Sequence, residues 1–157
     1  MHLPSERLTP EQHMFKFISN DSNKDNVPLD YISEFEKKKS ITFPDVLVDY
    51  YMNHNKAELK EVNFSIHNLE FSVEFLIPLK YGNVCVEKIL SFNEGNEYIS
   101  KTFIPLAEDI DGEDFYWDSS NGKVYYLSME NVENPIPICN SVEQFFEILN
   151  RSCAKER

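Results

Sequence analysis

The densest group of chemically versatile side chains in this sequence is a run of acidic residues between positions 108 and 118. Six carboxylates fall within eleven residues, and no lysine or arginine lies between positions 102 and 122. The six are Glu108, Asp109, Asp111, Glu113, Asp114 and Asp118. Carboxylates at this density bind calcium, act as acid and base, hydrogen-bond their own backbone in a turn, or attract a basic partner.

Calcium binding is the first of these uses to test. An EF-hand loop requires glycine at its sixth position and glutamate at its twelfth. Counted from Asp109, those positions hold Asp114 and Ser120, so the pattern fails and no metal site is predicted. No neighbouring group marks two of the acids as a catalytic pair. A solvated turn over residues 109–112 and an acidic docking surface are both compatible with the pattern, and both stay open.

The other reactive side chains form no recognisable site. The chain has four glycines, no P-loop and no GxSxG elbow, and its four histidines form no HExxH motif. Cys85 is expected as a packed or idle thiol on a strand, on the face opposite Val84 and Val86, and His54 as a semi-buried packing residue. We therefore predict no catalytic residue, no cofactor and no metal, and expect that the protein is not an enzyme.

The elements that position these residues begin with an N-terminal helical extension over residues 1–27. Thr9 and Pro10 suit the start of a short helix, which places Met14, Phe17 and Ile18 on one face. The extension either packs on the domain or stands away from it. A single domain is predicted over residues 28–157.

Two helices follow in this domain. Asp30 is expected to cap the first, which ends in three lysines at positions 37–39 that suit a helix C-terminus. The second begins at Pro44 and has the spacing of an apolar face. The predicted inward residues are Ile32 and Phe35 in the first helix, and Leu47, Tyr50, Tyr51 and His54 in the second.

From Glu61 the hydrophobic period changes from that of a helix to that of a strand. A strand is predicted over residues 69–79, followed by a returning strand with Val84, Val86, Leu90 and Phe92 on one face. A further strand ends at residues 102–107, and a hairpin pairs residues 115–118 with 123–128. Turns at 80–83, 93–96 and 119–122 join them. Consecutive strands joined by tight turns indicate an antiparallel sheet.

The last element is a helix capped by Asn140 or Ser141, with Ser141 and Gln144 spaced as a capping box. Val142, Phe145, Phe146 and Leu149 form its apolar face, which is expected to lie on the sheet. The predicted fold class is therefore α+β, with a mainly antiparallel twisted sheet of about five to six strands and helices packed around it.

Charge and composition limit the partners. The 157 residues carry a formal net charge of −12, which disfavours nucleic acid and anionic membranes and favours a basic protein. The N-terminus shows no secretory signal, and no apolar run approaches the roughly 18 residues of a membrane span. Three widely spaced cysteines suit reduced thiols, so a cytoplasmic location is expected.

Two groups of motifs, in order along the chain, resemble the SUKH superfamily over about residues 28–150. The first group is Ile32-x-x-Phe35-Glu36, Ile41-x-Phe43-Pro44-Asp45 and Tyr50-Tyr51 with Asn53 or Asn55. The second is the run 103–109, then Gly112-Glu113-Asp114, Trp117-Asp118, 122–125 and Ser141-x-x-Gln144-Phe145-Phe146-x-x-Leu149. Lys56 stands where a glycine usually follows the asparagine of the second helix, and the first 25 or so residues have no counterpart.

The resemblance implies an α+β domain that acts by binding. Its bacterial members neutralise a cognate toxin, often a nuclease, by forming a stoichiometric complex, and its fungal Knr/Smi-type members are hub-like cell-wall regulators. The toxin-binding role is the preferred expectation and the regulatory role is the alternative. The oligomeric state and the particular partner stay open.

The predicted partner-binding surface is the acidic run together with its aromatic residues. Alternate residues of a strand face opposite sides, so Phe115 and Trp117 are expected in the core while Tyr116 and Asp118 are exposed. The predicted contact residues are Glu108, Asp109, Asp111, Glu113, Asp114, Tyr116 and Asp118.

Overall fold

The computed structural model describes residues 14–20 and 25–154. In chain order the elements are β1 (Ile18–Asn20), α2 (Leu29–Lys39), α3 (Asp45–Asn53), β2 (Glu58–Leu59), β3 (Val62–Ile66), β4 (Leu69–Val73), β5 (Phe75–Leu76), α4 (Val86–Asn93), β6 (Phe103–Glu108), β7 (Asp114–Asp118), β8 (Val124–Leu127), the 3-10 helix η2 (Met129–Asn131), β9 (Ile136–Cys139) and α5 (Val142–Ser152).

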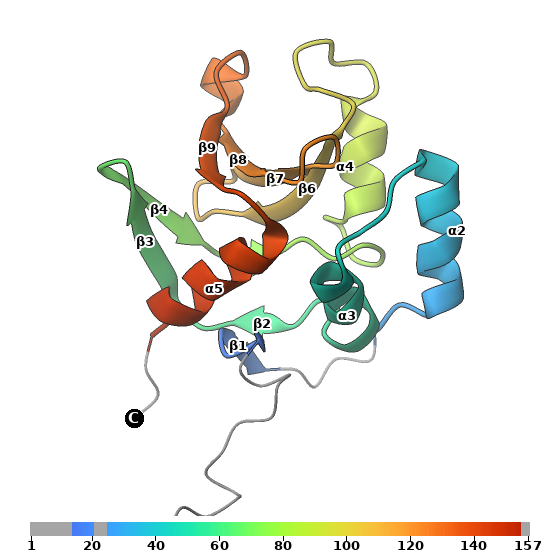
Figure 1. Cartoon of the computed structure of the whole chain (residues 1–157), viewed down its shortest axis with the longest axis horizontal. Coiled ribbons are helices and arrows are strands. Elements are labelled where there is room, and N and C mark those ends of the chain that lie inside the picture. Colours follow the sequence, from blue (N-terminus) through green and yellow to red (C-terminus); the bar gives the residue numbers. More distant parts are fainter. Residues whose placement is uncertain (1–13, 21–24, 155–157) are drawn as a thin grey trace, which may run out of the picture.

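Five of the strands form one antiparallel sheet in the order β5-β6-β7-β8-β9. β3 and β4 form a separate hairpin, and β1 pairs with β2. Figure 1 shows α5 crossing beside the curved sheet, with α3 next to it and with α2 and α4 along the other side of the molecule. The predicted α+β class, with its antiparallel sheet and C-terminal helix, is confirmed.

Helices α2 and α3 start directly after prolines. Pro28 and Pro44 occupy the N-cap positions with extended backbone, while Asp30 lies in the first turn of α2 and does not cap it. The expected cap was therefore misplaced, although a carboxylate in the first turn still favours the helix dipole. α2 ends at Ser40 in the left-handed conformation, after the three predicted lysines.

Helix α5 follows its sequence signals closely. The Ser141 hydroxyl accepts a hydrogen bond from the amide of Gln144 at 3.0 Å. The Gln144 side chain accepts in turn from the amide of Asn140 at 2.8 Å, one residue before the position in a standard capping box. All four predicted apolar residues of this helix are buried.

The main core lies between one face of the sheet and the helices α3 and α5. Phe115 and Trp117 face it, as predicted, with exposures of 0% and 4%. The Phe115 ring lies 5.3 Å from that of Phe145 in α5, and the Trp117 ring 6.0 Å from that of Phe43. These aromatic contacts bury a large apolar area and supply much of the driving force for folding.

The other face of the sheet has a smaller apolar cluster of its own, which we call the outer cluster. It consists of buried Ile99, Phe103, Tyr116 and Leu127, with Tyr125 and Val132 packed against them. Ile99 comes from the loop after α4, and Val132 from the loop after η2. The outer cluster therefore holds two loops over a face that the sequence pattern predicted to be solvated.

The segment predicted as a returning strand after residue 83 is helix α4, so that prediction was wrong. Val86 is buried and Ile89 and Leu90 pack partly on the main core, at the spacing of three and four residues that defines a helix face. Phe92, expected on the same strand face as Val86, is 80% exposed. Cys85 is buried, but as the residue before α4 and not on a strand.

The N-terminal extension is described from Met14, which has helical backbone, and residues 15–17 form a turn that the Ile18 amide closes by donating to the Phe15 carbonyl at 3.1 Å. Residues 18–20 form strand β1, and Phe15 and Phe17 are buried while Met14 and Lys16 are exposed. The predicted helix face with Phe17 and Ile18 was wrong, because these two residues lie in the turn and in β1. The extension therefore packs on the domain through this part. The expected helix start at Thr9 and Pro10 lies outside the described residues.

Two further differences concern strands. The long strand expected over residues 69–79 is broken into β4 and β5, because at Glu74 the chain leaves the β3–β4 hairpin and joins the edge of the main sheet. β9 was not predicted; it contains Pro137 and directly follows Pro135. Proline is tolerated there because β9 is an edge strand.

None of the helices in the described part of the chain is long and apolar enough to cross a membrane.

Candidate functional site

The acidic run occupies the end of β6, the turn after it and strand β7. Asp109 builds this turn from within. Its Oδ1 accepts hydrogen bonds from the amides of Asp111 and Glu113, both at 2.9 Å, and its Oδ2 accepts from the Tyr126 hydroxyl at 2.6 Å. Gly112 closes the turn at a φ of 86°. Asp109 is only 7% exposed, so the prediction that its side chain is exposed was wrong. Its carboxylate instead supports the turn.

Asp118 has a similar role at the other end of β7. Its Oδ1 accepts from the Ser120 amide at 3.0 Å, the Ser120 hydroxyl at 2.7 Å and the Thr102 hydroxyl at 2.7 Å. Burial raises the pKa of Asp118, but these hydrogen bonds outweigh it and hold the pKa below its ordinary value. At 8% exposure, Asp118 is also unsuited to the surface contact predicted for it.

Tyr116 does not form the predicted exposed aromatic contact. It is 3% exposed within the outer cluster, and its hydroxyl accepts a hydrogen bond from the Asn93 side chain at 3.3 Å. Burial and the nearby charge of Asp114 raise the pKa of Tyr116 to about 12. The alternation of side chains between the two faces of β7 was predicted correctly. The sequence of β7 does not indicate that loops cover the second face of the sheet.

Glu108 and Asp114 are directly opposite each other on β6 and β7. Like charges in this arrangement repel. Burial and then the charge of Glu108 raise the pKa of Asp114 to about 7, and burial likewise raises the pKa of Glu108. Asp114 Oδ1 is buried and has no hydrogen-bond partner among the described residues. The pair therefore retains a proton more readily than two separate carboxylates would.

The remaining predicted contact residues stay accessible. Asp111 is exposed, and Glu108, Glu113 and Asp114 are half-buried. In the described part of the chain none of these four carboxylates forms an ion pair with a lysine or arginine. The turn also presents Ile110, which is 73% exposed, so apolar and acidic groups lie together there.

Sequence reasoning missed a second set of acidic residues, which lie on two loops that pack over the outer face of the sheet. Glu113 accepts a hydrogen bond from the Met129 amide at 2.9 Å, which ties the acidic turn to the loop after β8. That loop carries exposed Glu130 and Glu133, and the loop after α4 carries exposed Glu94 and Glu97. Only the tertiary structure relates these glutamates to the predicted acidic run.

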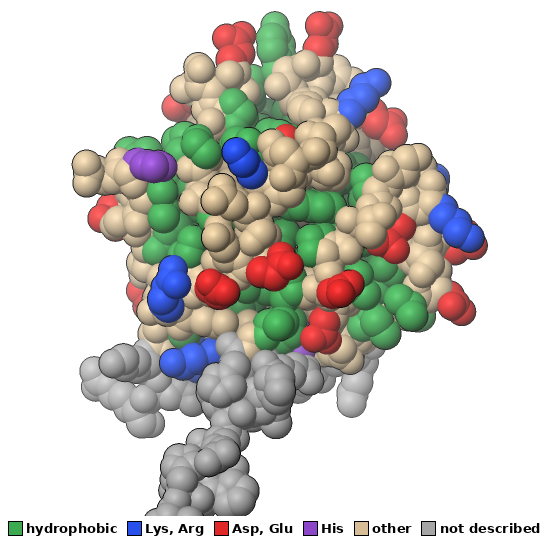
Figure 2. Space-filling view, viewed as in Figure 1, with side chains coloured by type: hydrophobic (Ala, Val, Ile, Leu, Met, Phe, Trp, Pro, Cys, Tyr) green, Lys and Arg blue, Asp and Glu red, His purple; other side chains and the backbone are tan. Residues whose placement is uncertain are grey.

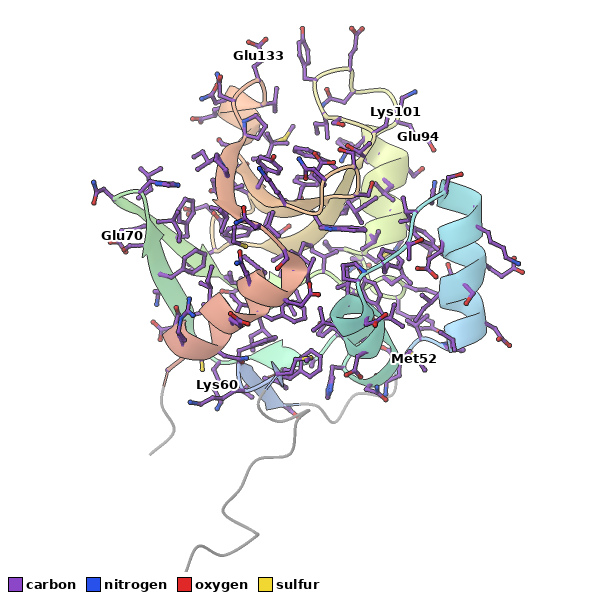
Figure 3. The ribbon with its side chains drawn as sticks, viewed as in Figure 1. Met52, Lys60, Glu70, Glu94, Lys101 and Glu133 are labelled. Carbon is purple, nitrogen blue, oxygen red and sulfur yellow. The ribbon has the colours of Figure 1, made fainter. Side chains whose placement is uncertain are left out.

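These two loops project at the same end of the molecule. Figure 2 shows acidic side chains at the tips of both projections with apolar groups between them, and Figure 3 places Glu133 on one loop and Glu94 and Lys101 by the other. Tyr98 and Met129 are 64% and 55% exposed on these loops. We call the acidic turn with these two loops the acidic surface.

Nothing in the described residues assembles a reactive centre. No cluster of three or more histidine, cysteine or acidic side chains there could hold a metal ion. Burial raises the pKa of the Cys139 thiol to about 11, which suppresses its reactivity. A cavity of about 480 Å³ between α2 and α4 is lined by apolar and polar side chains, among them Lys39, Lys101 and Glu94, and by no histidine or cysteine.

The fold and the acidic surface describe an α+β module with no assembled catalytic group among its described residues. The family model of the SMI1 / KNR4 family (SUKH-1) matches residues 26–148. The chain belongs to this family, as its motifs indicated. No curated protein matches the sequence.

Proposed function

We propose that this protein is a cytoplasmic immunity protein that neutralises a cognate toxin, of nuclease type, by binding it in a stoichiometric complex. It acts without catalysing a reaction. Membership of the SUKH-1 family supports a role of this kind. The acidic surface is the proposed contact region, with Asp111, Glu113 and the exposed loop glutamates in place of the buried Asp109, Tyr116 and Asp118.

The observation that carries the proposal is the separation of charge within the chain. Positions 102–152, which include β6 to β9 and α5, contain ten acidic residues and two basic residues, Lys123 and Arg151. A nuclease requires a cationic cleft to hold a phosphate backbone. A surface of opposite charge accelerates encounter with such a cleft and disfavours other partners. Tyr98, Met129 and Ile110 add exposed apolar groups of the kind that an interface can bury.

The test is protection of cells. Co-expression is expected to rescue growth from a toxin with a basic C-terminal domain encoded beside this protein, and the purified pair is expected to elute as a one-to-one complex. Toxins from unrelated loci serve as controls and should still kill. If several non-toxic partners are recovered and no toxin is neutralised, the regulatory role of the Knr/Smi type replaces the proposal.

The absence of catalysis is tested separately. Purified protein is expected to show no turnover of hydrolase or nuclease substrates, with or without divalent ions. Asp111→Asn and Glu113→Gln are included as variants of the exposed carboxylates. Turnover in the wild type that either substitution abolishes would contradict a binding role and assign a reaction to the acidic turn.

A further inference from the structure

The family-matched segment does not contain the whole core of this protein. Two aromatic residues that precede it, Phe15 and Phe17, are 5% and 0% exposed. The Phe15 ring lies 4.5 Å from the His54 ring and 5.8 Å from the Phe146 ring, and the Phe17 ring lies 5.3 Å from that of Phe146. These two rings cover the end of the core between α3 and α5.

A residue that follows the matched segment holds this N-terminal stretch in place. The Asn150 side chain accepts a hydrogen bond from the Phe17 amide at 3.1 Å and donates one to the Met14 carbonyl at 3.0 Å. Because an asparagine side chain can both accept and donate, Asn150 bonds the main chain at both ends of the turn over residues 14–17. After this turn β1 pairs with β2, and the Lys60 amide donates to the Phe17 carbonyl at 2.8 Å.

The C-terminal end joins the same region of the fold. Cys153 forms an antiparallel bridge with Val62, and the Ala154 amide donates to the Glu61 carbonyl at 2.8 Å. Residues from both ends of the chain therefore attach to neighbouring positions between 58 and 62. Figure 1 shows β1 and β2 beside the C-terminal end of α5.

We propose that residues 14–20 and 150–154 form a clasp that closes the core between α3 and α5, so that the family-matched segment 26–148 is not a complete folding unit in this protein. Asn150 is the residue that joins the two halves. The apolar residues Tyr50 and Phe146 would lose the cover of Phe15 and Phe17 if the clasp opened, and burial of such rings is a main source of stability. The proposal concerns folding and is independent of the toxin-binding role.

The first test uses Asn150→Ala in the full chain. Asn63→Ala is the matched control, because the Asn63 side chain is exposed and hydrogen-bonds only the Glu61 side chain. Alanine is the better helix former, so loss of stability at position 150 cannot come from helix propensity. We expect a lower melting temperature and at least tenfold faster hydrogen exchange at the amides of Phe17 and Lys60. The control should behave as the wild type.

The second test uses Phe17→Ala, with Phe92→Ala as its control, since the Phe92 ring is 80% exposed. The first substitution should lower the melting temperature by many degrees, Phe17→Leu should restore most of the loss, and the control should change nothing. If Asn150→Ala does not fold, exchange in the wild type decides the matter. Unprotected Phe17 and Lys60 amides in the wild type, or an unchanged melting temperature in both clasp variants, would overturn the proposal.

Discussion

Lys56 adopts a backbone conformation that suits glycine. Its φ is 69°, in the left-handed region, where a Cβ costs about 1–2 kcal/mol. Glycine is the residue expected here from the family pattern. Lys56 forms an exposed ion pair with Asp25 at 2.8 Å, which offsets little of this cost because such pairs contribute under about 1 kcal/mol.

We therefore expect Lys56→Gly to be more stable than Lys56→Ala by about 1 kcal/mol. Both substitutions remove the ion pair with Asp25, so their difference isolates the backbone strain. Urea denaturation of the two variants measures it. Equal midpoints would show that the left-handed conformation at this position is not strained.

Asp114 should give the protein an unusual dependence on pH. Its pKa is raised from 3.8 to about 7 in the folded state, so the folded protein binds this proton more tightly than the unfolded chain. The stability contributed by the protonated carboxyl is fully present below about pH 4 and is lost as the pH rises through 7. Most native carboxylates have the opposite effect.

Asp114→Asn should therefore be more stable than the wild type at pH 8, with the difference shrinking toward pH 5. The amide stays neutral at both values and relieves the repulsion from Glu108. Denaturation midpoints at the two pH values test this, with exposed Asp111→Asn as a control that should follow the wild type. A difference that does not vary with pH would contradict the raised pKa.

At the scale of elements, Asn55 connects the end of α3 to two other segments. It is 0% exposed. Its side-chain amide donates to the carbonyls of Asp25 at 2.8 Å and Lys80 at 3.1 Å, and its oxygen accepts from the Leu79 amide at 3.1 Å. The family motif contains an asparagine at position 53 or 55 of this sequence, and this geometry assigns the structural role to Asn55.

Asn55→Ala is expected to destabilise the fold by about 3 kcal/mol, because it leaves three buried backbone groups without their partner. Asn53→Ala is the matched control, since Asn53 is exposed and bonds only Asp49. Thermal or urea unfolding distinguishes them. Similar losses in both variants would mean that burial at position 55 is not decisive.

The outer cluster fixes the two loops of the acidic surface, and Tyr116 is its central ring. Phe103 lies 5.7 Å from it, and the Asn93 side chain bonds its hydroxyl. Tyr116→Ala should cost about 3–4 kcal/mol of stability, as for other buried aromatic residues. Tyr98→Ala, at a tyrosine that is 64% exposed, should cost under about 0.5 kcal/mol. A small loss for Tyr116→Ala would mean that the outer cluster is not packed.

For the whole molecule, the separation of charge determines how the proposed partner would approach. Most of the net charge of −12 arises between positions 102 and 152, and the acidic surface also carries exposed glutamates at the tips of two loops. Long-range attraction of this kind acts on the rate of association and is screened by salt. Glu97→Lys with Glu133→Lys should slow association with the cognate toxin about tenfold at low salt and flatten its dependence on salt.

The melting temperature of this double variant should stay close to that of the wild type, because both side chains are exposed. Glu58→Lys with Glu70→Lys is the matched control, since these exposed acids lie outside the acidic surface. Surface-binding kinetics at two salt concentrations measure the effect. Equal slowing by both pairs would show that net charge, and no particular surface, governs the encounter.

The sequence alone determined the features that depend on residues close together along the chain. Helices α2, α3 and α5, the hairpin of β7 and β8, the inward Phe115 and the family itself could be predicted, because caps, periodicity, turn residues and motif order are local. Helix α4 was missed because its apolar residues fit both a period of two and the spacing of a helix over only eight positions. Whether this segment formed a strand or a helix depended on the parts of the fold that pack against it.

Only the tertiary structure decided the functional geometry. Whether the second face of the sheet met water depended on loops from residues 94–102 and 128–135, whose packing over β7 leaves no trace in the β7 sequence. That packing buried Tyr116 and set the loops that carry Glu94, Glu97, Glu130 and Glu133 over the second face of the sheet. The contact of Phe17 with Asn150 likewise joins residues separated by 133 positions. Such long-range contacts form only when the chain folds, since no local preference specifies them.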